Sequence, residues 1–300
     1  MSQLTVVRPS GARVWVAAIR PATLWAGAVP VLVGTALAVG DGYRAWAPAL
    51  AALAGALLIQ IGTNLVNDYA DFTRGADGPD RLGPPRATAQ GWLTARQVAG
   101  GAAIALLGAA VVGVYIVWIG GWPMLAVGVG SLICAVAYTA GPFPLGYHGL
   151  GDLFVFLFFG LAAVCGTYYL QTGAISAGSV CAAVAVGALA TAILVVNNVR
   201  DRHTDARVGK RTLAVRLGAT GARLEYVGLL CLSYAAVVYA VATHRGGVGW
   251  LLVFASAPMA LREARAVWTK DGVELNAHLG GAARLELVFG VLLGLGASLW

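Results

Sequence analysis

Charged side chains are scarce in this chain. Only 11% of its 300 residues are Asp, Glu, Lys or Arg, whereas 59% are hydrophobic. Soluble domains usually carry about 25% charged residues, and no polar stretch here is long enough to bury a core of its own. The composition therefore excludes a soluble enzyme and an appended soluble domain, and it predicts a single integral membrane domain over residues 1–300.

Cysteine and histidine are also rare, with four of each. There is no Cys-x-x-Cys pair and no Cys/His metal spacing, which excludes a zinc site of the usual kind. The sequence also shows no Ser–His–Asp or Cys–His nucleophile, and its N-terminus lacks the features of a cleaved signal peptide. All four cysteines lie inside apolar runs, so we expect packing roles for Cys134, Cys165, Cys181 and Cys231.

Long apolar runs dominate what is present. Nine of them are long enough, or nearly so, to cross a bilayer as helices of about 20 residues. Glycine is abundant, with 41 residues, which suits close packing between membrane helices. We therefore predict an all-α protein with nine transmembrane helices around a central cavity, over about residues 22–40, 46–66, 97–119, 122–139, 152–171, 177–197, 222–243, 248–266 and 284–300.

The charges are distributed unevenly between the two sides of this bundle. If the N-terminus lies inside, all of the 20 Lys and Arg residues except Arg44 and Arg245 fall on one side. Positive charge marks the cytoplasmic face of a membrane protein. All 13 acidic residues except Asp41 share that side. Membrane orientation thus explains the net charge of +7, and we predict a plasma-membrane protein with a cytoplasmic active site and no nucleic-acid partner.

Two polar motifs end two of the apolar runs. Both contain Asn-x-x-x-Asp, displaced by 133 residues (197 − 64). Few, hard oxygen ligands suit Mg²⁺ that is shared with a phosphate. For one such motif alone, a helix end emerging into water would be an equally good explanation. Within each motif the residues are three or four apart and lie on one helix face: Asn64, Asp68 and Asp71, and then Asn197, Asp201 and Asp205.

Basic residues follow each acidic motif. Acids and bases at one level are what a complex of metal and diphosphate requires. The alternative for each basic residue is the general cytoplasmic bias of membrane proteins. The first motif is followed by Arg74, Arg81 and Arg86, and the second by Arg207, Lys210 and Arg211.

On these residues the chain resembles the UbiA superfamily of intramembrane aromatic prenyltransferases. Within it, the chain is most similar to the branch that prenylates 1,4-dihydroxy-2-naphthoate. The resemblance covers nearly the whole chain. It is carried by Arg20-Pro-Ala-Thr-Leu, Asn64-Leu-Val-Asn-Asp-Tyr-Ala-Asp with Gly75 and Asp77, Gly83-Pro-Pro-Arg86, Tyr138-Thr-Ala-Gly-Pro-Phe-Pro-Leu-Gly-Tyr147, Gly149-Leu-Gly-Asp152, Gly166-Thr-Tyr-Tyr, Asn197-Asn-Val-Arg-Asp201 and Gly209-Lys-Arg-Thr-Leu-Ala-Val-Arg-Leu-Gly218.

The resemblance implies a helical bundle whose cavity opens to the cytoplasm and sideways to lipid. It implies Mg²⁺-dependent transfer of a polyprenyl group from its diphosphate to the naphthoate ring, with loss of CO₂. The expected metal ligands and catalytic carboxylates are Asp68, Asp71, Asp201 and Asp205, with added oxygens from Asn64 and Asn197. The expected substrate contacts are Arg20, Arg74, Lys210, Arg211 and, as one of several aromatic candidates for the cavity wall, Tyr138.

Two alternatives stay open on the sequence. A transporter would also place charges on membrane helices, although its sites usually lie at mid-membrane. Other UbiA-type acceptors, such as 4-hydroxybenzoate, are the second alternative. The 138–152 connection has Phe143 where related enzymes often carry a basic residue, and it contains no Lys or Arg. We therefore expect no clamp for an acceptor carboxylate from this loop, which suits a decarboxylating reaction.

Overall fold

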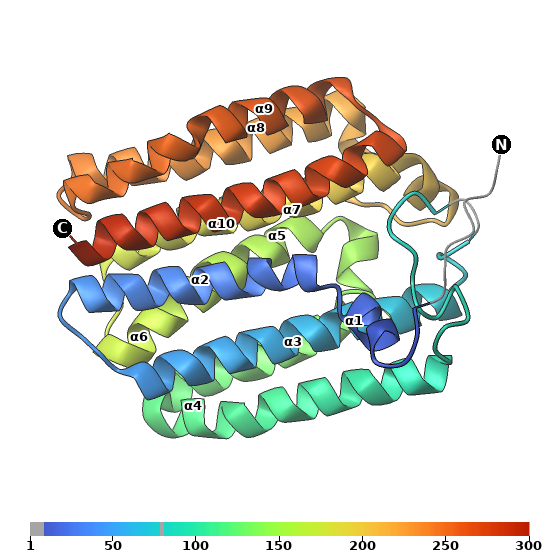
Figure 1. The fold of residues 1–300 in the computed structure, drawn as a ribbon, viewed down its shortest axis with the longest axis horizontal. Coiled ribbons are helices and arrows are strands. Elements are labelled where there is room, and N and C mark those ends of the chain that lie inside the picture. The colour runs from blue at the N-terminus through green and yellow to red at the C-terminus, as the bar shows by residue number, and fades with distance from the viewer. Residues whose placement is uncertain (1–8, 79–80, 300) are drawn as a thin grey trace.

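The computed structural model describes residues 9–78 and 81–299 of the chain. All regular elements in this part are helical, and the long helices run side by side in one bundle (Figure 1). Arg8 and Asp80, which the sequence places among the cytoplasmic charges, lie outside the described residues.

The first three helices lead to the first acidic motif. The short helix α1 (Arg13–Ile19) is followed directly by α2 (Pro21–Gly40), with Pro21 at the first position of the helix, where its missing N–H costs nothing. Helix α3 (Trp46–Thr73) continues past the predicted end of its apolar run. The motif of Asn64, Asp68 and Asp71 is therefore helical and presents one polar face.

Helix α4 (Ala95–Ala137) contains two predicted spans. It begins with a capping box in which Thr94 and Gln97 exchange hydrogen bonds. At Gly121 the backbone has φ 63° and ψ −153°, a conformation that is open essentially to glycine alone. The chain turns back there, so the 43 residues of α4 form two antiparallel spans, which correspond to the predicted spans 97–119 and 122–139.

The fifth span is a composite. It consists of α5 (Gly151–Val155), the π-helical segment η2 (Phe156–Cys165) and α6 (Gly166–Thr172), and it follows the 3₁₀ turn η1 (Leu145–His148). A π-helical stretch widens the helix and often occurs at functional sites. The apolar run did not predict the change from α-helix to π-helix, because hydropathy does not distinguish between the two helix types.

The second half repeats the arrangement of long helices. Helix α7 (Ala177–Arg207) carries the second acidic motif, again beyond the predicted end of its apolar run. Helix α8 (Leu213–Ala242) has a break at Gly218, where φ is 71°. The eighth span combines η3 (Val248–Ser256) with α9 (Ala257–Thr269), and after η4 (Gly272–Leu275) the last span is α10 (Asn276–Leu299).

These elements agree with the predicted nine spans. Seven helices among the described residues are long and apolar enough to cross a membrane, and α4 counts twice because of its turn. The η3–α9 segment provides the remaining span. Helix α10 begins eight residues before the predicted apolar span (284 − 276), and polar side chains of this added stretch, such as His278, are buried against α9.

Helix α7 lies at the centre of the bundle. Most of its apolar stretch is buried, and much of the buried surface is alanine. Where α7 packs against η2, a Cβ on Gly187 would lie 2.8 Å from Cα of Gly160. Helix α10 contacts both α2 and α7, and it closes the bundle between the first span and the second half. Small residues thus allow the close packing that membrane helices need in place of a hydrophobic driving force.

The acidic ends of α3 and α7 lie at the same end of the bundle. Figure 1 shows this end on the right, together with α1, the 74–94 connection and the start of α8. The opposite end holds the 41–45 and 243–247 connections, which contain Arg44 and Arg245. The fold therefore brings the two polar motifs and the long basic connections together.

Candidate functional site

The first acidic motif anchors the connection that follows it. Asp68 is 1% exposed, and its carboxylate accepts hydrogen bonds from the backbone N–H groups of Ala87 (3.1 Å) and Thr88 (3.4 Å). Asp71 accepts from Arg86 at 2.7 Å and from the hydroxyl of Tyr147 at 2.9 Å. These contacts fold the 74–94 connection over the end of α3.

Asp77 extends this cluster from the connection itself. It forms ion pairs with Arg81 and with Arg86, the latter at 3.2 Å. Burial raises the pKa of Asp77 above its usual value, although the charges of Arg86 and Arg81 oppose the shift. Burial also lowers the pKa of Arg81, and neighbouring Arg86 lowers it further. Buried acids and arginines are therefore close together here, and the positive charges of Arg81 and Arg86 stabilise the ionised carboxylate of Asp77.

The second motif is organised by an arginine within it. Arg200 is buried, and its guanidinium donates to both carboxylate oxygens of Asp201, at 2.8 and 2.6 Å. It also donates to the amide oxygens of Asn197 (2.6 Å) and of Asn276 at the start of α10 (2.9 Å). Asn276 in turn donates to the carbonyl of Leu82 at 2.7 Å, which ties the 74–94 connection to the second half of the bundle.

Asp205 is the least satisfied acid of the second motif. It is buried and forms an ion pair with Lys210 at 3.4 Å. Its Oδ2 atom has no hydrogen-bond partner in the part of the chain that the structure describes. A buried carboxylate oxygen without a partner is costly unless a cation or a ligand supplies one.

Tyr147 joins the two motifs. While its hydroxyl donates to Asp71, its ring contacts the guanidinium of Arg74 (5.3 Å to the centroid) and the ammonium of Lys210 (5.6 Å). The backbone N–H of Arg211 donates to the Tyr147 carbonyl at 2.9 Å. Burial, followed by the charge of Asp71, raises the pKa of the Tyr147 hydroxyl, so this group is a donor at neutral pH.

Arg20 is a half-buried cation at the junction of α1 and α2. Its backbone is left-handed (φ 57°), an uncommon state for a residue with a side chain. One of its guanidinium nitrogens has no hydrogen-bond partner among the described residues. Burial, together with the charges of Arg86 and Arg81, lowers its pKa to about 9. An anion bound here would relieve this unfavourable burial of charge.

Two other residues predicted to bind the metal or the substrate, Asn64 and Arg74, form hydrogen bonds within the protein. The amide group of Asn64 donates to the Ile19 carbonyl and to the Thr23 hydroxyl, both at 2.8 Å, so it braces the start of α2. The guanidinium of Arg74 donates to the backbone carbonyls of Thr139 and Gly141, and thereby holds the 138–150 loop.

An apolar cavity of about 610 Å³ adjoins the first motif. It is bordered by α2, α3, α4 and the composite fifth span, while α7 contributes Leu194. Three of the aromatic candidates named from the sequence or its apolar spans line it, namely Tyr138, Phe154 and Phe158. Its polar lining includes Asn64 and Asn67 of α3, which lie within one helical turn of Asp68. The cavity therefore runs from an apolar interior to the acidic end of α3.

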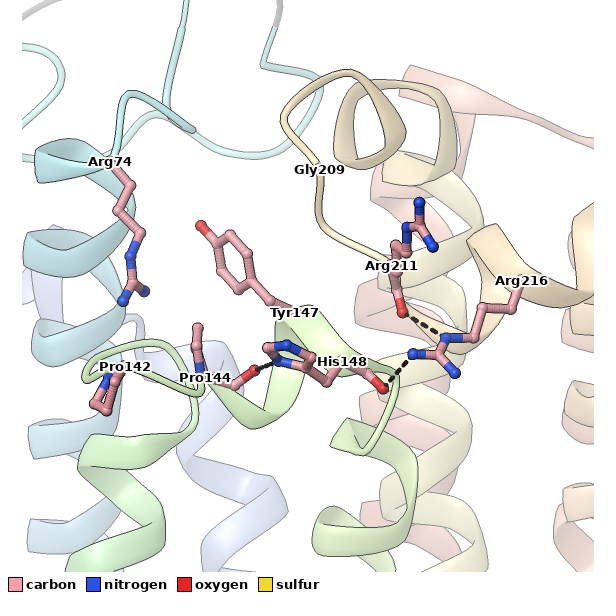
Figure 2. A pocket seen from close by; sticks show the side chains of 8 residues that line it. All are labelled: Arg74, Pro142, Pro144, Tyr147, His148, Gly209, Arg211 and Arg216. Atoms are coloured by element: carbon pink, nitrogen blue, oxygen red, sulfur yellow. Dashed lines mark hydrogen bonds between the residues drawn. The ribbon is translucent and has the colours of Figure 1, made fainter.

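A second pocket of about 500 Å³ lies on the loop side of Tyr147. Figure 2 shows Arg74 on one side of it, Arg211 and Arg216 on the other, and Tyr147 between them. These arginines come from other segments and border the 138–152 loop. The loop itself supplies no basic side chain, as expected from its sequence, and the basic groups of this pocket are supplied by its neighbours.

The donor set suits Mg²⁺, although no single site gathers it. In residues 9–78 and 81–299 no three His, Cys, Asp or Glu side chains lie close enough together to hold one ion. Each motif instead offers a pair of carboxylates one helical turn apart. Mg²⁺ is commonly held by one or two carboxylates plus waters and substrate phosphates. The paired carboxylates and the unpartnered oxygen of Asp205 therefore fit this ion.

Three residues of the site were missed as site residues by the sequence analysis. Arg86, Arg200 and Tyr147 make the principal contacts to the acids, yet only Arg86 was noted, as one of several basic residues. A signal existed for each, because all three lie inside the quoted motifs. Their roles depend on contacts across the fold, which linear spacing does not reveal.

Solved structures share this architecture. A UbiA homologue from Aeropyrum pernix K1 superposes with a TM-score of 0.70 at 16% identity, covering 89% of this chain and 96% of that one. A UbiA homologue from Archaeoglobus fulgidus, bound to GPP and Mg²⁺, gives a TM-score of 0.66 at 15% identity, with 95% and 99% covered. The fold is thus that of the UbiA class of helical membrane proteins.

Sequence comparison identifies the family. The model of the UbiA prenyltransferase family matches residues 27–285, and the chain belongs to this family. The 1,4-dihydroxy-2-naphthoate octaprenyltransferase of Escherichia coli K12 is 36% identical over 309 residues, covering 99% of both chains. The enzyme of the same name from Mycobacterium tuberculosis H37Rv is 41% identical over 260 residues, covering 86% of this chain and 87% of the relative. The chain is therefore a prenyltransferase, and the transporter alternative falls away.

Proposed function

We propose that this protein transfers a polyprenyl group from polyprenyl diphosphate to 1,4-dihydroxy-2-naphthoate, with loss of CO₂ and with Mg²⁺ as cofactor. The observation that carries the proposal is the meeting of two acidic helix ends beside the polar end of an apolar cavity. This arrangement provides a charged site for a diphosphate next to an apolar site for its tail.

The cavity would hold the prenyl chain near its diphosphate. Its wall is made almost entirely of apolar side chains. Moving a hydrocarbon tail from the surrounding lipid into the cavity therefore costs little free energy, because both environments are apolar. The aromatic rings of Phe154, Phe158 and Tyr138 would face the allylic end, where cation–π contact stabilises positive charge. The same wall excludes water, which would otherwise trap an allylic cation.

The acids and bases would bind the diphosphate. Mg²⁺ held by Asp68, Asp71, Asp201 and Asp205 supplies a Lewis acid that neutralises the leaving group. Asn64 and Asn197 remain proposed as further oxygen ligands. Among the basic residues proposed as phosphate contacts, Arg20 is supported by its buried, unpartnered nitrogen, and Lys210 by its position between Tyr147 and Asp205. Arg74 is engaged by backbone carbonyls, which supports a bracing role.

The transfer itself balances without a proton from the enzyme. The allylic C–O bond breaks as diphosphate leaves, and the electron-rich ring carbon that carries the carboxylate bonds to the prenyl carbon. The C–C bond to the carboxylate then breaks, its electron pair restores the aromatic ring, and CO₂ departs. A rigid, dry site favours this sequence by holding the two carbons within reach.

The choice of acceptor is supported by the relatives, two of which carry the name of this reaction at 36% and 41% identity. 4-Hydroxybenzoate is the alternative acceptor. The bacterial relatives also support a plasma-membrane location. The basic connections at the end of the bundle that holds the site support a cytoplasmic orientation.

The test is a side-by-side assay of the purified protein in lipid. We expect prenylated naphthalenediol and one CO₂ per transfer from carboxyl-labelled 1,4-dihydroxy-2-naphthoate, and no product when Mg²⁺ is chelated. Dominant formation of prenyl-4-hydroxybenzoate at equal acceptor concentration would contradict the acceptor assignment. Transfer that persists with an excess of chelator would contradict the role of Mg²⁺.

A further inference from the structure

The pocket on the loop side of Tyr147 is separate from the apolar cavity, and one loop borders both. Tyr138, at the start of this loop, lines the apolar cavity. Pro142, Pro144, Tyr147 and His148, further along, line the second pocket (Figure 2). The pocket volume of about 500 Å³ falls within the range of small-molecule sites, roughly 300–1,000 Å³. The protein therefore has a second place for a ligand, on the aqueous side of the loop.

The walls of this pocket combine flat rings with cations. The ring of His148 stacks on Phe143 at 3.7 Å between centroids, and its Nδ1 atom is within 2.9 Å of the Pro144 carbonyl. Tyr147 and the two prolines add further flat surfaces. Such walls suit a planar aromatic ligand, because ring faces and proline rings pack well against a flat apolar surface.

Two of the three arginines around the pocket are fixed and one is free. Arg74 is held by the carbonyls of Thr139 and Gly141. Arg216 donates to the carbonyls of His148 (2.9 Å) and of Arg211 (3.2 Å). The guanidinium of Arg211, in contrast, has no hydrogen-bond or ion-pair partner anywhere in the described chain. A guanidinium is shaped to bind a carboxylate through two parallel hydrogen bonds.

The ligand of this pocket must lack a long apolar tail. A prenyl tail in the pocket would lie among loops and charges, whereas the cavity of about 610 Å³ is apolar and lies between the membrane helices. The tail-bearing donor therefore belongs in the cavity. A small aromatic acid can reach the loop side from water, and the Tyr147 hydroxyl, which donates to Asp71, connects this pocket to the acidic motifs.

We propose that this pocket is the docking site of the aromatic acceptor, with Arg211 binding its carboxylate and Arg216 holding the backbone of Arg211 in place. The inference rests on the proposed function and deepens it. Tyr147 separates the docked ring from the acids. The ring therefore leaves the arginine behind when it moves to the donor, and the carboxylate is not held by a permanent ion pair when CO₂ must depart.

The experiment compares Arg211→Ala with the natural protein on two acceptors. One is 1,4-dihydroxy-2-naphthoate, and the other is naphthalene-1,4-diol, which lacks the carboxylate. We expect Arg211→Ala to raise KM for the naphthoate about tenfold, the effect of one charge-assisted hydrogen bond at a partly exposed site. The kcat, the KM for polyprenyl diphosphate and all constants for the diol should stay within twofold. Arg211→Lys should recover part of the loss.

Arg96→Ala is the matched control, because it removes an exposed arginine from the same end of the bundle, away from the pocket. Its constants should match those of the natural protein. An unchanged KM for the naphthoate in Arg211→Ala, or an equal loss with the diol, would overturn the docking site. Failure of the natural protein to prenylate any acceptor would instead overturn the proposed function, so the two outcomes are distinguishable.

Discussion

The acids of the two motifs differ in what holds them. Asp68 accepts hydrogen bonds from two backbone N–H groups, and Asp71 accepts them from an arginine and a tyrosine. Asp201 accepts two hydrogen bonds from two nitrogens of one guanidinium. Asp205 retains an oxygen without a partner. The proposed arrival of Mg²⁺ and diphosphate therefore requires some protein cations to exchange a carboxylate for a phosphate. Arg86 and Lys210 are placed for this exchange, since each pairs with an acid of a motif.

The first prediction separates charge from shape at these acids. Asp68→Asn and Asp201→Asn keep the size of the side chain and one acceptor oxygen but remove the negative charge. We expect each variant to lose transfer activity by about 10²- to 10³-fold, the usual cost of removing one electrostatic contribution to a transition state. The measurement is product formation in lipid, with the amount of folded protein determined by size-exclusion chromatography.

Glu274→Gln is the matched control, because Glu274 is an exposed acid at the same end of the bundle. It should keep full activity. If either Asn variant formed product at close to the natural rate, the assignment of Mg²⁺ to that carboxylate would be wrong.

At the scale of the element, the position of each motif depends on how far its helix extends. Helices α3 and α7 continue past the apolar runs, so the acids share a helix face rather than a flexible loop. Close packing then aligns the helices. At Gly187 of α7 a Cβ would also lie 3.0 Å from the Phe156 carbonyl, which leaves no room for a side chain.

The second prediction concerns this contact. Gly187→Val should force α7 and η2 apart, at a cost of about 1–3 kcal/mol for overpacking. We expect the midpoint of thermal unfolding in detergent to fall by roughly 5 °C. Gly228→Val is the comparison, because Gly228 of α8 is exposed and a Cβ there meets nothing within 4 Å. An equal loss in both variants would show that helix propensity, not the helix contact, is responsible.

At the scale of the whole molecule, all the proposed chemistry lies at one end of the bundle. The two motifs, the 74–94 connection and the basic pocket all lie at that end, and Arg44 and Arg245 lie at the other. Apolar side chains are exposed along the helices between the two ends, as expected for a surface that faces lipid.

The third prediction is that the end with the site faces the cytoplasm. Single cysteines at Val208 and Val273 would mark this end, and one at Val248 the other; all three positions are exposed. The background would have the four natural cysteines replaced by alanine. An impermeant thiol reagent should label Val248→Cys in intact cells, and the other two only after lysis. Labelling of Val208→Cys and Val273→Cys in intact cells would reverse the orientation.

The sequence by itself determined the class of fold, the number of spans and the location of the polar motifs. It could do so because these properties depend on local quantities. Hydropathy over about 20 residues decides whether a segment enters the bilayer, and a spacing of three or four residues decides which side chains share a helix face. Asn64, Asp68 and Asp71 are one example, and their shared face appears in α3 as predicted.

The tertiary structure alone decided which groups satisfy the acids and where the ligand spaces lie. Asp71 accepts hydrogen bonds from Arg86, 15 residues away in the chain, and from Tyr147, 76 residues away. The amide of Asn276 donates to the carbonyl of Leu82, 194 residues away. The sequence predicted Arg211 as a substrate contact, but only the fold showed that it borders a pocket together with Tyr147 and His148. The physical reason is that buried charges must be paired in space, and helix packing rather than spacing along the chain selects the partners.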